Sequence, residues 1–176
     1  MFAFYALQPY LLELYGDQRA FGIVGLAAAI IAGTELLAGL IAPRVHRWIP
    51  RRTQALMLAL LVGSASLAVI GGTSSFWVAM VPLVIWGLTF SISMPIRQAY
   101  LNGLIPSQQR ATVLSFDNLM ASAGGVVAQP ALGRVADVWS YSAAYLVSAG
   151  IQLAAVPFLA LAWREHAPSD QAIDGN

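Results

Sequence analysis

Cysteine and lysine are both absent from this sequence, and only 10% of its 176 residues are charged. Without cysteine, neither a disulfide framework nor a thiolate metal site can form. Without lysine, the chain has no phosphate-binding loop of the Gly-Lys-Ser/Thr type and no Schiff-base lysine. A net charge of +1 provides no concentrated basic face. These absences exclude ATP use through that loop and argue against a nucleic-acid partner.

Apolar residues are the main component of the sequence. They make up 59% of the chain and give it a mean hydropathy of +0.70, whereas a soluble domain carries roughly 25% charged residues. A helix needs about 20 consecutive apolar residues to cross the hydrocarbon layer. Five stretches are near this length: residues 21–42, 55–72, 76–95, 111–132 and 142–163. Composition and length therefore predict an all-α integral membrane protein.

A shorter apolar stretch covers residues 1–15 and contains Gln8, Pro9 and Glu13. At about 1.5 Å per residue it is too short to cross a bilayer core of about 30 Å. We interpret it as the far end of a helix whose start is missing, and no positively charged leader precedes it. The prediction is a six-helix transmembrane bundle over residues 1–163 with a truncated first helix. A polar, disordered tail is expected over residues 164–176.

Turn-forming residues predict where the helices end. Pro43 and Pro50 bracket an arginine-rich segment that we expect to be a turn, and residues 71–75 form a second, glycine- and serine-rich turn. Pro106 and Ser107 are expected to open the next helix, with Ser107 as its N-cap.

Arginine placement predicts the orientation in the membrane. With six crossings the loops alternate between two sides, and seven arginines fall on one side: Arg44, Arg47, Arg51, Arg52, Arg97, Arg110 and Arg164. Only Arg19 and Arg134 fall on the other side. The positive-inside rule therefore places the arginine-rich side and the C-terminus in the cytoplasm. We expect a multi-pass protein of the plasma or inner membrane.

An internal repeat relates the two halves of the chain. Two apolar stretches end in the same pattern, Gly-x-x-Ala-x, which begins at Gly39 in one and at Gly133 in the other, 94 residues later. The same offset places Glu35 on Gln129, so two polar residues are expected at equivalent depths. Inverted three-helix repeats are a common building unit of membrane transporters. The repeat predicts a 3+3 arrangement of the helices.

Residues 39–47, with the sequence GLIAPRVHR, are similar to a loop motif of the form Gly-x-x-x-Asp-Arg/Lys-x-Gly-Arg/Lys. The segment keeps the first glycine and both basic residues of the motif: Gly39, Arg44 and Arg47. Pro43 and His46 replace its aspartate and second glycine. The similarity implies that these residues lie in a cytoplasmic loop.

Two further stretches complete a resemblance to a known family. Residues 105–115 are similar to the start of the eleventh helix of that family, and residues 129–137 are similar to its Pro-x-x-Gly-x-x-x-Asp ending. With the loop motif, they show that essentially the whole chain resembles the C-terminal six helices of the major facilitator superfamily.

The resemblance implies one half of a twelve-helix fold that moves a small solute by secondary active transport and alternating access, with proton coupling expected. It implies that the first and fourth helices of the half line a central cavity and that the third and sixth face lipid. The implied partners are the lipid bilayer, a small-molecule substrate, and either an N-terminal six-helix half or a second copy of the chain. No cofactor is implied, and the chain alone is expected to be inactive.

Seven residues are candidates for the substrate or proton pathway: Tyr5, Gln8, Glu35, Trp86, Arg97, Asp117 and Gln129. Glu35 lies mid-stretch, where a carboxylate is costly unless it faces a cavity, meets a partner or is protonated. It is therefore a candidate proton carrier, with a neutral hydrogen bond between helices as the alternative. Arg97 could hold an anionic group or form a gate with Asp117. The alternative for Arg97 is a topological anchor at the cytoplasmic side. The alternative for Asp117 is an ion pair with Arg97 or Arg110 that only positions its helix.

The remaining candidates carry weaker signals. Tyr5 and Gln8 could bind substrate or simply pack, Trp86 lies on the expected cavity-lining helix, and Gln129 precedes Pro130 at an expected bend. Two other function classes stay open. A membrane-embedded enzyme could use Glu35, Asp117 or His46 as acid and base, although no catalytic spacing is recognisable. A membrane scaffold without transport activity is the other.

Overall fold

The computed structural model describes residues 2–17, 19–165 and 167–170. The helices within these residues are α1 (Phe2–Tyr15), α2 (Phe21–Trp48), α3 (Arg52–Gly72), α4 (Phe76–Leu104), α5 (Arg110–Val138), α6 (Tyr141–Leu153), α7 (Val156–Arg164) and the short 3-10 helix η1 (Pro168–Asp170). Five segments are long and apolar enough to cross a membrane: Phe21–Ala42, Arg52–Gly72, Phe76–Leu104, Arg110–Val138 and Tyr141–Arg164. The prediction of an all-helical membrane protein is confirmed, and each predicted stretch lies inside one of these segments.

The last of these segments is one span broken into two helices. α6 ends at Leu153 and α7 begins at Val156, with a turn at Ala154 and Ala155 between them. Pro157 lies in the first turn of α7. Its missing N–H and its ring prevent the hydrogen-bond ladder of α6 from continuing.

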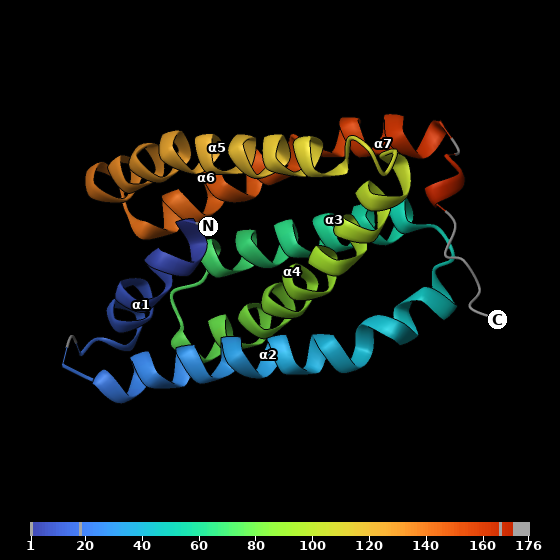
Figure 1. Ribbon diagram of the computed structural model, residues 1–176. Coiled ribbons are helices and arrows are strands. Elements are labelled where there is room, and N and C mark those ends of the chain that lie inside the picture. The colour runs from blue at the N-terminus through green and yellow to red at the C-terminus, as the bar shows by residue number, and fades with distance from the viewer. Residues whose placement is uncertain (1, 18, 166, 171–176) are drawn as a thin grey trace.

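α3 lies at the centre of the bundle, packed against α4 and against α6 and α7 (Figure 1). α2 packs on α4, and α5 packs on α6. The α2–α3 and α4–α5 connections and the end of α7 meet at one end of the bundle, on the right in Figure 1. We call this the arginine-rich end, because it holds Arg51, Arg52, Arg110 and Arg164.

The short helix α1 is tied to α3 and α6. Its Leu7 and Tyr10 are each 1% exposed and belong to the main apolar core, to which α2, α3, α4 and α6 also contribute. The Tyr10 hydroxyl donates to the Ile70 carbonyl at 2.8 Å, and the Tyr145 hydroxyl donates to the Ala3 carbonyl at 2.9 Å. These two bonds fix α1 at the edge of the bundle although it has only 14 residues.

Two helix contacts in the bundle depend on glycine. A Cβ at Gly71 of α3 would lie 2.8 Å from the Ser142 carbonyl oxygen, and one at Gly87 of α4 would lie 2.6 Å from Thr34 Oγ1 of α2. Small residues permit such close approach between membrane helices. They set the spacing of α3 from α6 and of α4 from α2.

The predicted turn between Pro43 and Pro50 is wrong over most of its length. α2 continues through Pro43 and ends only at Trp48. Membrane helices tolerate an internal proline, because neighbouring groups satisfy the freed backbone. The chain leaves the helix at Ile49, whose extended backbone is the conformation that a following proline favours. The motif residues Gly39 and Arg44 therefore lie on a helix and not in a loop.

The predicted role of Ser107 as an N-cap is also wrong. α5 begins at Arg110, and its N-cap position is Gln109. The Gln109 N–H donates to the Pro106 carbonyl at 3.0 Å, which closes a turn ahead of the helix. Ser107 lies inside this turn, two residues before the N-cap position of α5.

The prediction of a disordered tail is wrong for the tail residues of η1. Asp170 is only 2% exposed. Its carboxylate accepts hydrogen bonds from the Thr53 backbone N–H at 2.7 Å and from the Thr53 hydroxyl at 2.9 Å. η1 thus folds back onto the start of α3. Residues 166 and 171–176 lie outside the described residues, and for them the prediction stays untested.

Candidate functional site

Two adjoining hollows run between α4 and the α5–α6–α7 side of the bundle. The first, of about 380 Å³, is lined by α3, α4, α6 and α7. The second, also about 380 Å³, is lined mainly by α1, α4, α5 and α6. Both include Trp86, Phe90 and Gln152, so they meet along α4. We call the two hollows together the central groove.

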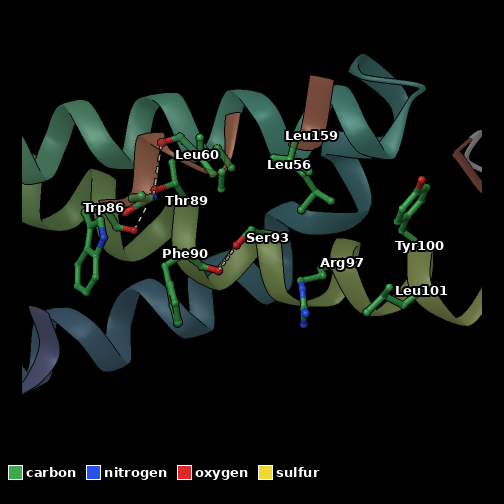
Figure 2. A pocket seen from close by; sticks show the side chains of 13 residues that line it. Leu56, Leu60, Trp86, Thr89, Phe90, Ser93, Arg97, Tyr100, Leu101 and Leu159 are labelled. Atoms are coloured by element: carbon green, nitrogen blue, oxygen red, sulfur yellow. Dashed lines mark hydrogen bonds between the residues drawn. The ribbon is translucent and has the colours of Figure 1, made fainter. Parts of the chain in front are cut away.

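One face of α4 supplies most of the polar lining of the first hollow (Figure 2). Trp86, Thr89, Ser93, Arg97 and Tyr100 follow one another at spacings of three and four residues, so they lie on one side of the helix. The Thr89 hydroxyl donates to the Trp86 carbonyl at 2.9 Å, and the Ser93 hydroxyl donates to the Phe90 carbonyl at 2.7 Å. Each hydroxyl has its proton engaged by its own helix and keeps acceptor lone pairs for a ligand.

Aromatic rings form the wall where the two hollows meet. Trp86 is 4% exposed, and its ring lies 4.6 Å from Phe4 of α1 and 5.9 Å from Phe90. Phe4 and Phe90 meet edge to face at 5.1 Å. The three rings join α1 to α4 and give the groove an apolar, stackable surface beside its hydroxyl groups. The expectation that Trp86 lies on a lining helix agrees with this position.

Gln152 is a lining residue that the sequence analysis missed. It lines both hollows, and its Nε2 atom reaches toward the Leu60 carbonyl at 3.5 Å. Gly63 leaves room for this meeting: a Cβ there would lie 3.0 Å from Gln152 Nε2 and 3.3 Å from Thr89 Oγ1. The sequence did contain a signal for this role: Gln152 is an isolated amide side chain in the apolar stretch 142–163, which we expected to face lipid.

Arg97 and Asp117 form an ion pair between α4 and α5. The Arg97 Nη2 atom lies 2.5 Å from Asp117 Oδ1, and the two side chains are 46% and 27% exposed. The expected pairing of these two residues is therefore present. Arg110, the other expected partner of Asp117, instead donates to the Asn102 carbonyl at 3.3 Å. Arg97 also lines the central groove, so the pair ties a groove residue to the neighbouring helix.

Glu35 lies apart from the central groove. It is an exposed residue of α2 and lines a separate hollow of about 400 Å³ with Gly39 and four residues of α4, of which only Phe90 also lines the groove. Within the described residues its side chain makes neither a hydrogen bond nor an ion pair. The alternative of a hydrogen bond between helices is thus not realised among them. The hollow that Glu35 lines does not include Asp117, the other acid–base candidate of the enzymatic alternative.

Tyr5 and Gln129 come together in a smaller hollow of about 290 Å³ between α1 and α5. Gln129 also lines the central groove, where it lies beside Gly125. Gln8 is exposed and lines none of these hollows. Of these three candidates, Gln129 is therefore the one that the fold brings to the groove itself.

The residues of the expected loop motif lie at the last turns of α2. Arg44 donates from Nη1 to the Leu40 carbonyl at 2.8 Å, so its guanidinium folds back along its own helix. The side chains of His46 and Arg47 lie outside the part of the chain that the structure describes. In that part, no group of three or more His, Cys, Asp and Glu side chains is assembled that would hold a metal ion.

Comparisons with known proteins add one finding to this geometry. Neither a search of curated proteins nor a search of solved structures returned a match. The family model of the Major Facilitator Superfamily matches residues 1–175. A match over almost the whole chain agrees with the apolar helices and with the polar groove between them. The chain therefore belongs to the major facilitator superfamily, a family of membrane transporters.

Proposed function

We propose that this chain is the C-terminal half of a secondary active transporter, and that the central groove is its share of the solute pathway. One observation carries the proposal. Thr89, Ser93 and Arg97 line a single groove although they belong to a segment apolar enough to span a membrane. Polar and charged groups are costly in hydrocarbon and are retained where they face a cavity or a water-filled path.

The groove offers one small solute several kinds of contact. Trp86 and Phe90 provide aromatic surface, the hydroxyls of Thr89 and Ser93 provide acceptors, and Gln152 provides an amide with donors and acceptors. Binding sites for small molecules are mostly apolar with a few placed polar groups. This composition supports binding of a solute that has both an apolar and a polar part.

A second six-helix body is part of the proposal. Leu132 is the only buried residue of α5 in the described chain, and large apolar side chains of α5 and α2 are exposed, among them Phe116, Val126, Leu36 and Leu40. The superfamily builds its pathway between two halves. We propose that an N-terminal half, or a second copy of this chain, covers the groove. The 3+3 inverted repeat and a cytoplasmic arginine-rich end belong to the same proposal.

Proton coupling is assigned to Glu35. Its exposed position on α2, beside a hollow, and its lack of a partner in the described chain both support a role as the proton carrier of the cycle. Alternating access would then move Glu35 between the two aqueous sides. Arg97 and Asp117 would open and close on the α4–α5 side.

The experiment is uptake into proteoliposomes that hold this chain with a matching N-terminal half. A panel of radiolabelled sugars, amino acids and organic acids is supplied with and without an imposed proton gradient. Saturable uptake of at least one solute class is expected with both halves present. Saturable uptake by this chain alone would show that a second copy covers the groove. Ser93→Leu should lower that uptake at least about tenfold by removing an acceptor and filling the groove, while Leu58→Ala on the exposed face of α3 should not. Equal uptake by both variants would contradict the assignment of the groove.

A further inference from the structure

The arginine-rich end holds a buried polar cluster that the proposed pathway does not use. η1 supplies the Asp170 carboxylate, and α3 supplies Thr53 as the second residue of its first turn. Thr53 is fully buried and Asp170 is 2% exposed. The two carboxylate oxygens accept separately from the Thr53 N–H at 2.7 Å and from its hydroxyl at 2.9 Å. The backbone N–H and the hydroxyl of Thr53 are thus both satisfied by a residue 117 positions later in the chain.

Asp170 supplies what the start of α3 lacks. The first N–H groups of any helix have no partner within it, and they attract negative charge. The residue at the N-cap of α3, Arg51, makes no capping hydrogen bond with its side chain. A carboxylate from η1 takes that place, and it does so in a buried position where its charge is not screened by water.

Arg52 connects the same cluster to α4. Its Nη1 atom donates to the Ala99 carbonyl of α4 at 3.1 Å and to the Ser169 carbonyl of η1 at 3.0 Å. One guanidinium thus holds both the end of α4 and the returning tail. Ala99 lies two residues after Arg97 and next to Tyr100, which lines the central groove.

Gly103 permits the tail to lie directly on α4. A Cβ at this position would lie 2.7 Å from the Ser169 Cβ atom, so any larger residue would push η1 away. α4, α3 and η1 are therefore in contact around one point, and the contact requires a tail that returns to the bundle.

We propose that Pro168–Asp170 acts as a strap that fixes the arginine-rich end of α4 against α3 and so positions Arg97 and Tyr100 in the groove. With the strap docked, α4 keeps the place seen in the structure. With the strap released, the last turns of α4 lose one of their ties to α3. The Arg52–Ala99 hydrogen bond and the packing of Ile96 on Ala55 and Leu56 remain, so this end of α4 becomes more mobile without leaving the bundle. The strap thereby controls access to the groove at this end, a role that rests on the proposed pathway, whereas the docking itself does not.

Docking is tested by the alkylation rate of a thiol in the strap, in the full chain and in membranes. The chain has no cysteine and the Ser169 hydroxyl oxygen is buried, so Ser169→Cys places a single thiol inside the docked strap. A thiol reagent should modify it at least about tenfold more slowly than Ser74→Cys in the exposed α3–α4 connection. Adding Asp170→Asn should raise the Ser169→Cys rate at least about tenfold by removing a charge-assisted bond. Thr53→Val, which keeps the volume and removes the hydroxyl, should raise it as well, and Asp170→Glu should restore part of the protection.

Control of the groove is tested separately with Ser93→Cys as the only cysteine. Its alkylation rate should rise when Asp170→Asn is added, because the freed end of α4 exposes the groove. A Ser169→Cys alkylation rate that Asp170→Asn and Thr53→Val leave unchanged would overturn the strap. A raised Ser169→Cys rate with an unchanged Ser93→Cys rate would overturn its control of the groove while leaving the docking in place. Neither readout depends on a transported solute, so the result is independent of the uptake experiment.

Discussion

The guanidinium of Arg97 on α4 lies 2.5 Å from the carboxylate of Asp117 on α5, in a partly exposed position beside the central groove. α4 and α5 pack mainly on other partners, α4 on α2 and α3 and α5 on α6. The pair is therefore a bridge between two helices that the core does not hold together. Because little other packing joins α4 to α5, this ion pair can form and break without disrupting the core.

Neutralising the Arg97–Asp117 ion pair should change the free energy of unfolding little but lower solute uptake strongly. An exposed ion pair contributes about 0–1 kcal/mol, so Arg97→Gln and Asp117→Asn should each lower the free energy of unfolding by less than about 1 kcal/mol. Both should lower uptake by the assembled transporter, and the charge swap Arg97→Asp with Asp117→Arg should recover part of it. Unfolding in detergent and uptake by the same preparations measure the two effects. A stability loss above about 3 kcal/mol, as for a buried pair, would show that the bridge is structural.

Gly71→Ala should destabilise the bundle, whereas Gly72→Ala should not. A Cβ at Gly71 would meet the Ser142 carbonyl at 2.8 Å, while a Cβ at Gly72 meets nothing within 4 Å. Overpacking of this kind costs about 1–3 kcal/mol. Thermal unfolding of the two variants in one detergent compares adjacent positions of one helix. Equal melting temperatures would mean that α3 and α6 are not in close contact at Gly71.

Cysteine labelling from either side of the membrane tests the orientation. Ser74 lies in the α3–α4 connection and Ser107 lies in the α4–α5 connection, at opposite ends of the bundle. Under the positive-inside rule, Ser74→Cys should react with an impermeant thiol reagent on intact cells, and Ser107→Cys should react only in opened membranes. The opposite pattern would reverse the orientation.

Glu35→Gln should impair proton-driven uptake more than solute exchange. Net uptake coupled to protons needs a group that binds and releases a proton, whereas exchange proceeds with that group permanently neutral. The assembled transporter is measured in both modes, with Glu13→Gln, at an exposed position near the end of α1, as the control. Wild-type rates in both modes for Glu35→Gln would remove Glu35 from the coupling mechanism.

Hydropathy alone was enough for the fold class and for the five membrane-spanning segments, because length and apolar composition are properties of each segment by itself. The end of α2 was not predictable in this way. In a water-soluble protein a proline such as Pro43 usually ends a helix, but in this membrane protein α2 continues through it. The last span reads as one helix, and Pro157 divides it.

The site was less accessible to sequence reasoning than the fold. Arg97 was one of the two partners predicted for Asp117, because the charged residues near one side of the membrane stand out in an apolar sequence. Gln152 was missed because its role depends on Gly63 and Thr89, which approach it only in the folded bundle. The docking of Asp170 on Thr53 joins residues 117 positions apart, and a polar tail gives no local sign of the place where it binds.

The central claim is that one face of α4 lines an aqueous solute pathway, and thiol accessibility tests it without knowledge of the solute. Ser93 lines the groove, while Leu58 is 51% exposed on α3. Each is replaced by cysteine in turn, in the chain assembled with its N-terminal half in membranes. An impermeant cationic thiol reagent should modify Ser93→Cys at least about tenfold faster than Leu58→Cys, since only a water-exposed thiol ionises to the reactive thiolate. Equally slow modification of both cysteines would contradict a pathway along α4.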